Sequence, residues 1–140
     1  MPTSEYLRAM LIGYVITIAI ETVVLVALLS RRHSMRVRLF AGVWLTLCTY
    51  PVVWLVLPPL FTPESRSWYL LIAETFAPLA EVIVFWLALS RQLPSDPNAT
   101  RRDTLVIVVA NLCSFGLGEL LRSFQLLVVN SPISLPSWWG

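Results

Sequence analysis

Four long runs of apolar residues follow one another along the chain, separated by short stretches rich in arginine, proline and serine. A transmembrane helix needs about 20 consecutive apolar residues to cross the hydrocarbon core of a bilayer. The pattern predicts an all-α membrane protein with four transmembrane helices that run up and down. The runs that reach the required length lie at about Tyr6–Ser30, Leu39–Leu57, Trp68–Ser90 and Thr104–Val129.

Polar residues repeat within these runs. Glu21 and Glu81 are each followed nine residues later by Ser-Arg, and the segment 47–51, Leu-Cys-Thr-Tyr-Pro, is similar to Leu-Cys-Ser-Phe-Gly at 112–116. The repeated unit is a whole helical hairpin. Because each hairpin crosses the membrane twice, both copies enter it with the same orientation, which predicts two tandem hairpins related by a pseudo-twofold axis along the membrane normal. The two copies and the short outer-face tail that follows them lie at about 6–58, 67–129 and 130–140.

Composition indicates the same class of protein. Hydrophobic residues make up 57% of the 140 positions and charged residues only 13%, which is far from the mixture found in a soluble domain. The four runs leave almost no mass outside the membrane, so residues 1–140 are expected to form a single transmembrane domain. Any binding or chemistry must then take place inside the bundle, at its surface or through a partner protein.

Every basic residue in the chain is an arginine, and the arginines are concentrated in two connections. The loop 31–38 holds four of them and the loop 91–102 holds three. Because short cytoplasmic loops carry the excess of positive charge, both loops are predicted to be cytoplasmic and both termini to lie outside, in a bacterial inner membrane. The net charge of +2 is therefore a signal of topology and indicates no nucleic-acid partner. His33, the single histidine, is expected to be a solvated residue of the first loop.

The two repeated glutamates lie where a negative charge is costly and needs a compensating partner. Glu21 and Glu81 lie nine residues, or ~13 Å of helix, from the Ser-Arg pairs that begin the cytoplasmic loops, close to the centre of the bilayer. An ionised side chain at this depth costs a few kcal/mol, and no basic residue lies level with either glutamate. Each must therefore be protonated, hold a cation, donate hydrogen bonds between helices or contact another subunit. These two glutamates are the main candidates for a proton- or cation-binding site.

Three further residues join these candidates. Counting back along each hairpin places Cys48 and Cys113 level with the two glutamates, and Asn111, which corresponds to Thr46 in the repeat, could orient a bound ion. Two thiolates with two carboxylates would favour a borderline metal ion such as zinc, although the spacing is no known ligand signature. A proton site needs only the carboxylates, and the cysteines then serve as small packing residues. A bound cation is the only cofactor that the sequence suggests, and its identity stays open.

A second set of charged residues lies toward the outer ends of the last two helices. Glu119 and Arg122 are three apart on one helical face, and counting along the hairpin brings Glu74 within reach of the same arginine. These residues are predicted to form a structural ion-pair cluster. Glu74, which like Glu21 is followed by a threonine, also offers a rival register for the repeat, but this register loses the Ser-Arg match.

The candidate functions follow from these residues. The chain contains no His-Glu-x-x-His, no Gly-x-Ser-x-Gly and no glycine-rich phosphate loop, so an enzyme has little support. Paired carboxyl groups inside a membrane favour a proton- or cation-coupled transporter, a channel or a membrane subunit of that kind. The alternative is a noncatalytic subunit that assembles or regulates a larger membrane complex, with its acids satisfied by a partner's arginine. The expected partners are the lipid bilayer and either further copies of the chain or another membrane protein.

Overall fold

The computed structural model describes residues 4–61, 65–91, 94 and 96–128, without the side chains of Ser90, Arg122 and 124–128. Within this part of the chain the protein is helical and contains no strand. The predicted all-α class is therefore confirmed, whereas the tail at 130–140 lies outside the described residues. The main helices are α1 (Ser4–Leu28), α2 (Met35–Pro51), α3 (Arg66–Phe85) and α4 (Pro97–Val128).

Four helical segments of the described chain are long and apolar enough to cross a membrane. Short helical turns extend two of them: η1 (Val52–Val56) and η2 (Pro58–Leu60) follow α2, and η4 (Trp86–Ser90) follows α3. The segments match the four predicted apolar runs and are compatible with a membrane location. Their bounds are Ser4–Leu28, Met35–Leu60, Arg66–Leu89 and Pro97–Leu121.

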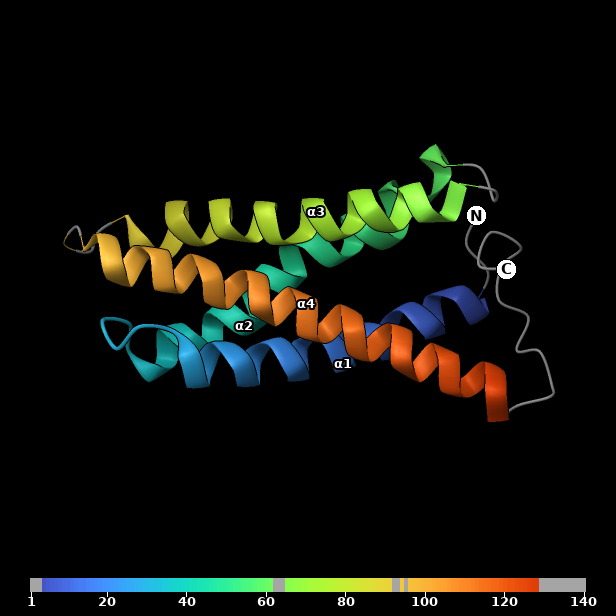
Figure 1. Cartoon of the computed structure of the whole chain (residues 1–140), viewed down its shortest axis with the longest axis horizontal. Helices are drawn as coiled ribbons and strands as arrows, with labels where there is room; N and C mark the ends of the chain where they lie inside the picture. The colour runs from blue at the N-terminus through green and yellow to red at the C-terminus, as the bar shows by residue number, and fades with distance from the viewer. Residues whose placement is uncertain (1–3, 62–64, 92–93, 95, 129–140) are drawn as a thin grey trace.

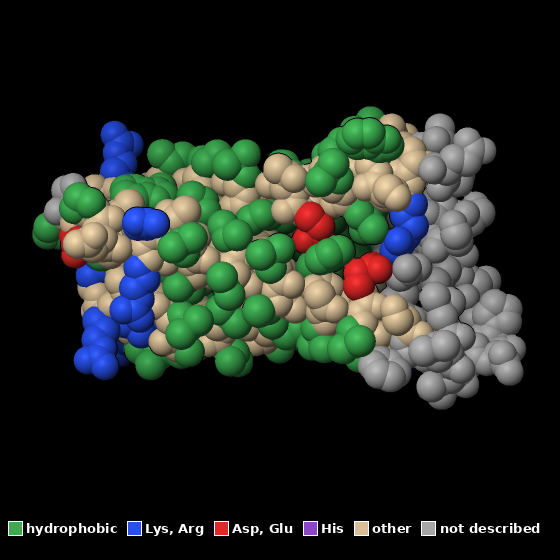
Figure 2. All heavy atoms as spheres, viewed as in Figure 1, with side chains coloured by type: hydrophobic (Ala, Val, Ile, Leu, Met, Phe, Trp, Pro, Cys, Tyr) green, Lys and Arg blue, Asp and Glu red, His purple; other side chains and the backbone are tan. Residues whose placement is uncertain are grey.

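Large apolar side chains cover the outside of the bundle, where a soluble protein would carry polar groups. Figure 2 shows such side chains along the middle of the molecule, with arginines gathered at one end. Contiguous apolar surface of this extent is rare on soluble monomers, and lipid tails are the solvent that suits it. Examples that are more than half exposed are Leu11, Val15, Val23, Trp68 and Leu87.

Capping side chains begin two of the helices. Ser34 precedes α2, and its Oγ accepts a hydrogen bond from the backbone N–H of Val37 at 3.4 Å. Asp96 precedes α4, and its Oδ1 accepts from the backbone N–H groups of Asn98 and Ala99 at 3.0 and 3.1 Å. A side chain that satisfies the free N–H groups of a first turn in this way is worth about 1 kcal/mol.

Pro51 changes the course of the second membrane segment. A proline has no N–H for the helical ladder, and the next turn, η1, is π-helical. Two tyrosines from neighbouring helices donate to carbonyls of this turn. The Tyr6 hydroxyl donates to the Trp54 carbonyl, and the Tyr69 hydroxyl donates to the Val53 carbonyl at 3.1 Å. These bonds join α1 and α3 to the far end of the α2 segment.

The helices form a bundle in which α1 and α3 face each other. α1 packs against α2 and α4, and α3 packs against the same two helices. Figure 1 shows that α1 begins and α4 ends at one end of the molecule, opposite to the α1–α2 and α3–α4 connections. α1 and α2 approach closely at Gly42, where an added Cβ would lie 2.6 Å from the Thr22 Cα. Small residues permit such close contact between membrane helices.

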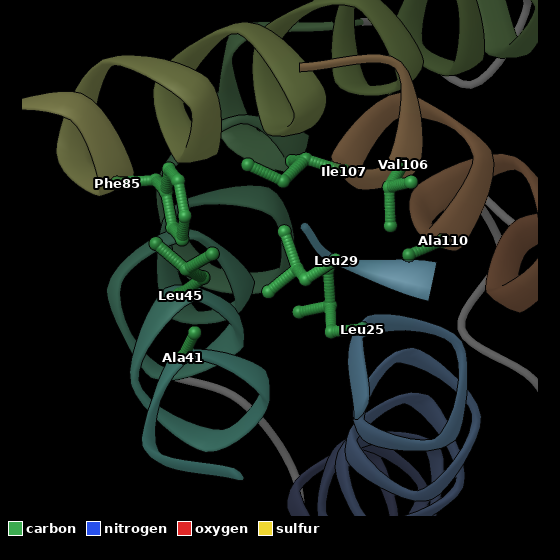
Figure 3. Close-up of a cluster of buried hydrophobic side chains, with 8 residues drawn as sticks. All are labelled: Leu25, Leu29, Ala41, Leu45, Phe85, Val106, Ile107 and Ala110. Carbon is green, nitrogen blue, oxygen red and sulfur yellow. The ribbon is translucent and has the colours of Figure 1, made fainter. Parts of the chain in front are cut away.

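An apolar layer fills the bundle between the two glutamates and the arginine-rich connections. On α1 and α3 its members follow Glu21 and Glu81, and on α2 and α4 they lie nearer the loops. Phe85 and Leu45, for example, have no exposed surface. Figure 3 shows these side chains pointing into the space between the helices. The apolar layer comprises Leu25, Leu29, Ala41, Leu45, Phe85, Val106, Ile107 and Ala110.

Candidate functional site

Glu21 lies in α1 with only 2% of its surface exposed. The Thr46 hydroxyl on α2 donates to Glu21 Oε2 at 2.6 Å, and the Ser114 hydroxyl on α4 donates to Oε1 at 2.7 Å. Burial of a carboxyl group is costly without hydrogen-bond partners. Each oxygen of Glu21 has one, and the two partners come from the two helices that pack against α1.

Glu81 lies in α3 and is also only 2% exposed. The Thr49 hydroxyl on α2 donates to Glu81 Oε1 at 2.8 Å, and the Asn111 Nδ2 on α4 donates to Oε2 at 2.8 Å. The helices that supply these donors are the same two that serve Glu21. The two carboxyl groups therefore sit on facing helices and share α2 and α4 as their sources of hydrogen bonds.

Neither glutamate is compensated by a positive charge. In the part of the chain that the structure describes, the partners of both carboxyl groups are hydroxyl and amide groups, and no arginine or histidine contacts them. An acid within a membrane helix is usually paired with a cationic side chain or with backbone groups. Here neutral donors take that place.

The structure brings together Glu21, Glu81 and Asn111, three of the predicted site residues. It adds three donors that the sequence analysis did not assign, Thr46, Thr49 and Ser114. A signal for the last two was present, because each follows the cysteine of its hairpin at the depth of the glutamates. Hydroxyl residues are common in membrane helices, so the signal becomes specific only when the facing residue is known.

The two cysteines stay outside this arrangement. Cys113 is exposed on α4, Cys48 is half-buried on α2, and neither thiol hydrogen-bonds a glutamate. Successive residues of a helix point about 100° apart, so the hydroxyl residue after each cysteine faces the interior instead. Among the described residues, no group of three or more His, Cys, Asp or Glu side chains is close enough to hold a metal ion. The geometry thus favours a carboxyl site without thiolates.

The charged residues near the start of α3 include Arg66, an arginine that the sequence analysis did not place in the predicted ion-pair cluster. Glu119 on α4 pairs with Arg66, with 3.2 Å between Oε1 and Nη2. The side chain of Arg122 lies outside the described residues, and Glu74 is half-buried on α3. The sequence predicts Arg122 on α4 as a partner of Glu119, and the packing of α3 against α4 adds Arg66 from the neighbouring helix.

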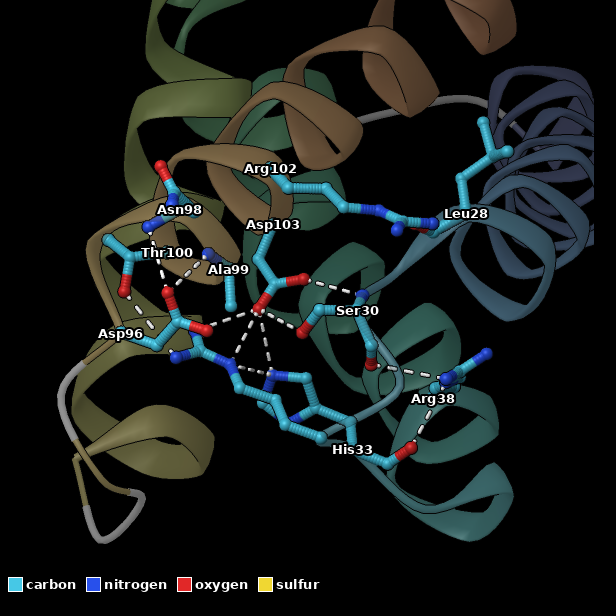
Figure 4. A network of polar contacts seen from close by, with 11 residues as sticks. Leu28, Ser30, His33, Arg38, Asp96, Asn98, Ala99, Thr100, Arg102 and Asp103 are labelled. Carbon is cyan, nitrogen blue, oxygen red and sulfur yellow. Dashed lines mark hydrogen bonds and ion pairs between the residues drawn. The ribbon is translucent and has the colours of Figure 1, made fainter.

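A second buried polar cluster connects the two arginine-rich loops (Figure 4). Asp103 on α4 is 1% exposed and accepts from the Ser30 backbone N–H at 2.7 Å and from the Ser30 hydroxyl at 2.8 Å. Arg32 pairs with the same carboxylate at 2.8 Å, and the His33 Nε2 lies 3.0 Å from it. One carboxylate of the second hairpin thus holds the loop of the first.

The prediction that His33 is a solvated loop residue is wrong. Its surface is 3% exposed, its Nε2 contacts Asp103, and its ring meets Phe85 edge-on with 5.1 Å between the centroids. In the sequence, His33 is surrounded by arginines and serine, which is typical of a solvated loop. The fold instead packs this loop against α3 and α4.

Arginines of the same region also satisfy the end of α1. In the last turn of α1, Arg38 donates to the Val26 carbonyl at 3.1 Å and Arg102 donates to the Leu28 carbonyl at 3.0 Å. Arg38 also donates to the carbonyls of Ser30 and His33 in the loop that follows, at 3.1 Å each. The last carbonyls of a helix have no partner within it, and cationic side chains are suitable donors for them. Part of the arginine excess therefore stabilises the end of this helix.

Comparison with known proteins identifies no relative. No protein-family model, curated protein or solved structure matches the chain. The chemistry of the buried residues is therefore the basis for a functional assignment.

Proposed function

We propose that the protein is a membrane transporter, channel or membrane subunit that takes up protons or cations at the Glu21–Glu81 pair. The observation that carries this proposal is the compensation of both buried carboxyl groups by neutral donors alone. An ion pair would hold each group in its charged form. With neutral partners, a carboxyl group can lose and regain its charge without breaking an ion pair, as a transport site requires.

The internal hydrogen bonds also bear on the alternative, a noncatalytic subunit whose acids await an arginine of a partner protein. Each glutamate already has two donors within the chain and is only 2% exposed. A partner's guanidinium group could reach them only after these bonds had been rearranged. The geometry favours a site that works within this chain, either alone or in a homo-oligomer.

The contacts further support two tandem hairpins related by a pseudo-twofold axis. In the repeat, Thr46 corresponds to Asn111, and Thr49 corresponds to Ser114. Each glutamate accepts from its own hairpin at the first of these positions and from the other hairpin at the second. The four hydrogen bonds therefore form two equivalent pairs, as expected if a twofold rotation exchanges the two hairpins.

The apolar layer follows the same correspondence. Residues that occupy matching positions in the two hairpins both contribute to it, so the repeat extends from the glutamates toward the loops. A parallel repeat of this kind provides two related half-sites at one depth. The matching pairs are Leu25 with Phe85, Ala41 with Val106, and Leu45 with Ala110.

We also propose a bacterial inner-membrane location with both arginine-rich connections in the cytoplasm. Figure 2 shows a band of arginines at one end of the bundle and a smaller basic area at the other. A concentration of arginine on one side is typical of cytoplasmic loops. In this orientation the start of α1 and the end of α4 lie outside. The exposed arginines of the band are Arg31, Arg36, Arg91, Arg101 and Arg102.

Reconstitution in liposomes that contain a pH-sensitive dye tests the proposed function. We expect the parent protein to dissipate an imposed proton gradient, or to exchange protons against an imposed cation gradient. Glu21→Gln, Glu81→Gln and the double variant should each reduce this flux to the level of protein-free liposomes. Glutamine keeps the size of the side chain but cannot take up a proton. Glu74→Gln, which removes a carboxyl group of α3 outside the pair, should retain most of the flux.

Two results together would contradict the proposal: the parent protein shows no flux, and the glutamine variants are at least as stable as the parent. The carboxyl groups would then serve as hydrogen-bonding groups between helices, a known role of polar side chains in membrane bundles.

A further inference from the structure

Each hydroxyl group that contacts the glutamate pair has a second acceptor. The hydroxyls of Thr46 and Thr49 lie 2.9 and 3.2 Å from carbonyls one turn earlier in α2. The Ser114 hydroxyl lies 2.9 Å from the Asn111 carbonyl. A hydroxyl group has one hydrogen to donate and can also accept, so each of these side chains can donate either to a glutamate or to its own helix.

This choice allows each carboxyl group to exist in two charge states. When the carboxyl group is ionised, the hydroxyl groups donate to it. When it is protonated, its own O–H donates to a hydroxyl oxygen, and that hydroxyl turns its hydrogen to the backbone carbonyl. A buried polar group left without a partner is costly, and neither state creates one.

Asn111 contributes hydrogens to the site. Its Nδ2 lies 2.8 Å from Glu81 Oε2 and 3.1 Å from the Ile107 carbonyl. Both neighbouring atoms are hydrogen-bond acceptors, so the group of Asn111 that faces them must be the amide nitrogen, which donates, and not the amide oxygen. A hard metal cation between the carboxylates would instead require oxygen ligands directed toward it.

We propose that the ion bound and released by the glutamate pair is the proton, and that metal cations do not compete for the site. This inference rests on the proposed function and narrows its substrate. All four partner side chains direct hydrogens at the carboxyl oxygens, and three of them can reverse the direction of their bond. Uptake forms one O–H bond at a carboxyl oxygen and neutralises one negative charge, and release reverses the step.

Other titratable groups near the pair determine which control variants the experiments need. On α4, the carboxylates of Asp103 and Glu119 form ion pairs with arginines, and within the described residues they do not contact the glutamate pair. Glu74 is the carboxyl group of α3 that lies two turns from the pair, so it is the variant that checks for a remote charge. The nearest groups on each helix are Tyr14 on α1, Cys48 and Tyr50 on α2, Glu74 on α3, and Asp103, Cys113 and Glu119 on α4.

A membrane-permeant carbodiimide tests the proposal without requiring transport, because it attacks a protonated carboxyl group in an apolar environment. The full chain in lipid nanodiscs is labelled, and the adduct is counted and located by mass spectrometry. We expect labelling at Glu21 or Glu81 that falls as the pH rises. Replacing an inert organic cation by sodium, potassium, calcium or zinc at constant pH and ionic strength should leave it unchanged. Protection by any of these metals would overturn the proposal.

Variants of Thr46 test the hydroxyl partner in the same assay. Thr46→Val removes a donor to the ionised form of Glu21 and should move half-maximal labelling to higher pH by about one unit, the effect of losing one hydrogen bond to a charged group. Thr46→Ser keeps the hydroxyl and should label like the parent. Equal behaviour of both variants would overturn the role of the hydroxyl. If the liposomes showed no flux but labelling still depended on pH and not on metal ions, the proposed transport would be wrong. The inference that the glutamate pair binds a proton would still hold.

The two sides of the glutamate pair differ in polarity, and this independent observation concerns access. Toward the arginine-rich connections, all eight members of the apolar layer are hydrocarbon side chains. On the opposite side, the rings of Tyr14 and Tyr50 lie 5.2 Å apart between centroids, and the Tyr50 hydroxyl approaches Gly13, where a side chain would collide with it. Within the described residues the Tyr50 hydroxyl makes no hydrogen bond, so it can bind water.

We infer that, in the conformation of this structure, the pair exchanges protons with the end of the bundle where α1 begins, while the apolar layer separates it from the arginine-rich end. Transport across the membrane then requires a second conformation in which this layer opens. Protons need water or polar groups to move, and a layer of packed hydrocarbon offers neither. The tyrosine side carries hydroxyl groups that can bind water next to the site.

Carbodiimide labelling of right-side-out and inverted membrane vesicles, with the pH of each side set independently, tests this access. Labelling should follow the pH on the side where α1 begins. Tryptic cleavage at the arginine-rich loops identifies the other side in the same vesicles. Leu45→Ser and the milder Ala110→Ser place a hydroxyl in the apolar layer and should make labelling respond to both sides, whereas Leu112→Ser on the exposed face should not. Labelling of the parent that followed the pH of the arginine-rich side would overturn the inference.

Discussion

Asp103→Ala is expected to lower the free energy of unfolding by about 3–5 kcal/mol, because it removes one partner of a buried charge network. The carboxylate is 1% exposed and accepts hydrogen bonds from Ser30, Arg32 and His33. Without it, these donors stay in a largely buried loop with no acceptor. Asp103→Asn keeps the shape and removes the charge, so its loss should be smaller. Unfolding by SDS in mixed micelles, followed by helix content, measures both losses.

Asp96→Ala is the matched control for this prediction. Asp96 also belongs to the second hairpin and also accepts two hydrogen bonds, but it is exposed and acts as a helix cap. Its removal should cost about 1 kcal/mol. Equal losses for Asp96→Ala and Asp103→Ala would show that the buried network contributes no more than a cap, and the proposed connection between the hairpins would be wrong.

Gly42→Ala is expected to destabilise the bundle by about 1–3 kcal/mol, because it overpacks the contact between α1 and α2. The added Cβ would lie 2.6 Å from the Thr22 Cα and 2.8 Å from its Cβ. A backbone atom cannot move aside as a side chain can, so the two helices must separate. Separation would lengthen the bond between Thr46 and Glu21, and we expect a several-fold loss of proton flux. SDS unfolding and the liposome assay measure the two effects.

Gly118→Ala provides the control for Gly42→Ala. It introduces the same methyl group on α4, where no described atom outside the adjoining backbone of this helix lies within 4 Å of the new Cβ. Both stability and flux should therefore remain close to those of the parent. If Gly42→Ala proved equally neutral, the close approach of α1 and α2 would not be needed to position Glu21.

The two buried polar clusters differ in their chemistry. Asp103 has cationic partners, which hold its charge in place and fasten one loop to α4. Glu21 and Glu81 have hydroxyl and amide partners, which suit either charge state. The Asp103 cluster thus joins the two hairpins at one end of the bundle, and the proposed proton site lies in the middle, where the partners of the carboxyl groups are neutral.

Much of the architecture could be predicted because it depends on length and depth. Each apolar run is long enough to span the hydrocarbon core, and the structure contains four helical segments at the expected places. Helical rise is constant, so counting along each hairpin placed Cys113 level with Glu81, and two residues close to this cysteine, Asn111 and Ser114, hydrogen-bond the glutamates. Depth was therefore a sound guide to which residues lie level with one another.

The direction in which each side chain points around its helix, and therefore the residue that it contacts, could not be predicted in the same way. Cys48 and Thr49 differ by one residue and lie at nearly the same depth, yet only the threonine faces Glu81. The direction in which a helix turns each side chain depends on how it packs against its neighbours, and an apolar membrane helix carries little polar pattern to reveal that direction.

Helix packing also explains why the burial of His33 and the pairing of Glu119 with Arg66 were not predicted. The sequence by itself determined the membrane class, the number of long helices and the depth of the paired glutamates, since these depend on local apolar length and a constant rise per residue. Only the tertiary structure decided that His33 is buried against Asp103, that Arg66 pairs with Glu119 and that four neutral donors surround the glutamates. Each of these contacts joins residues from different helices or loops, and helix packing selects which of them meet.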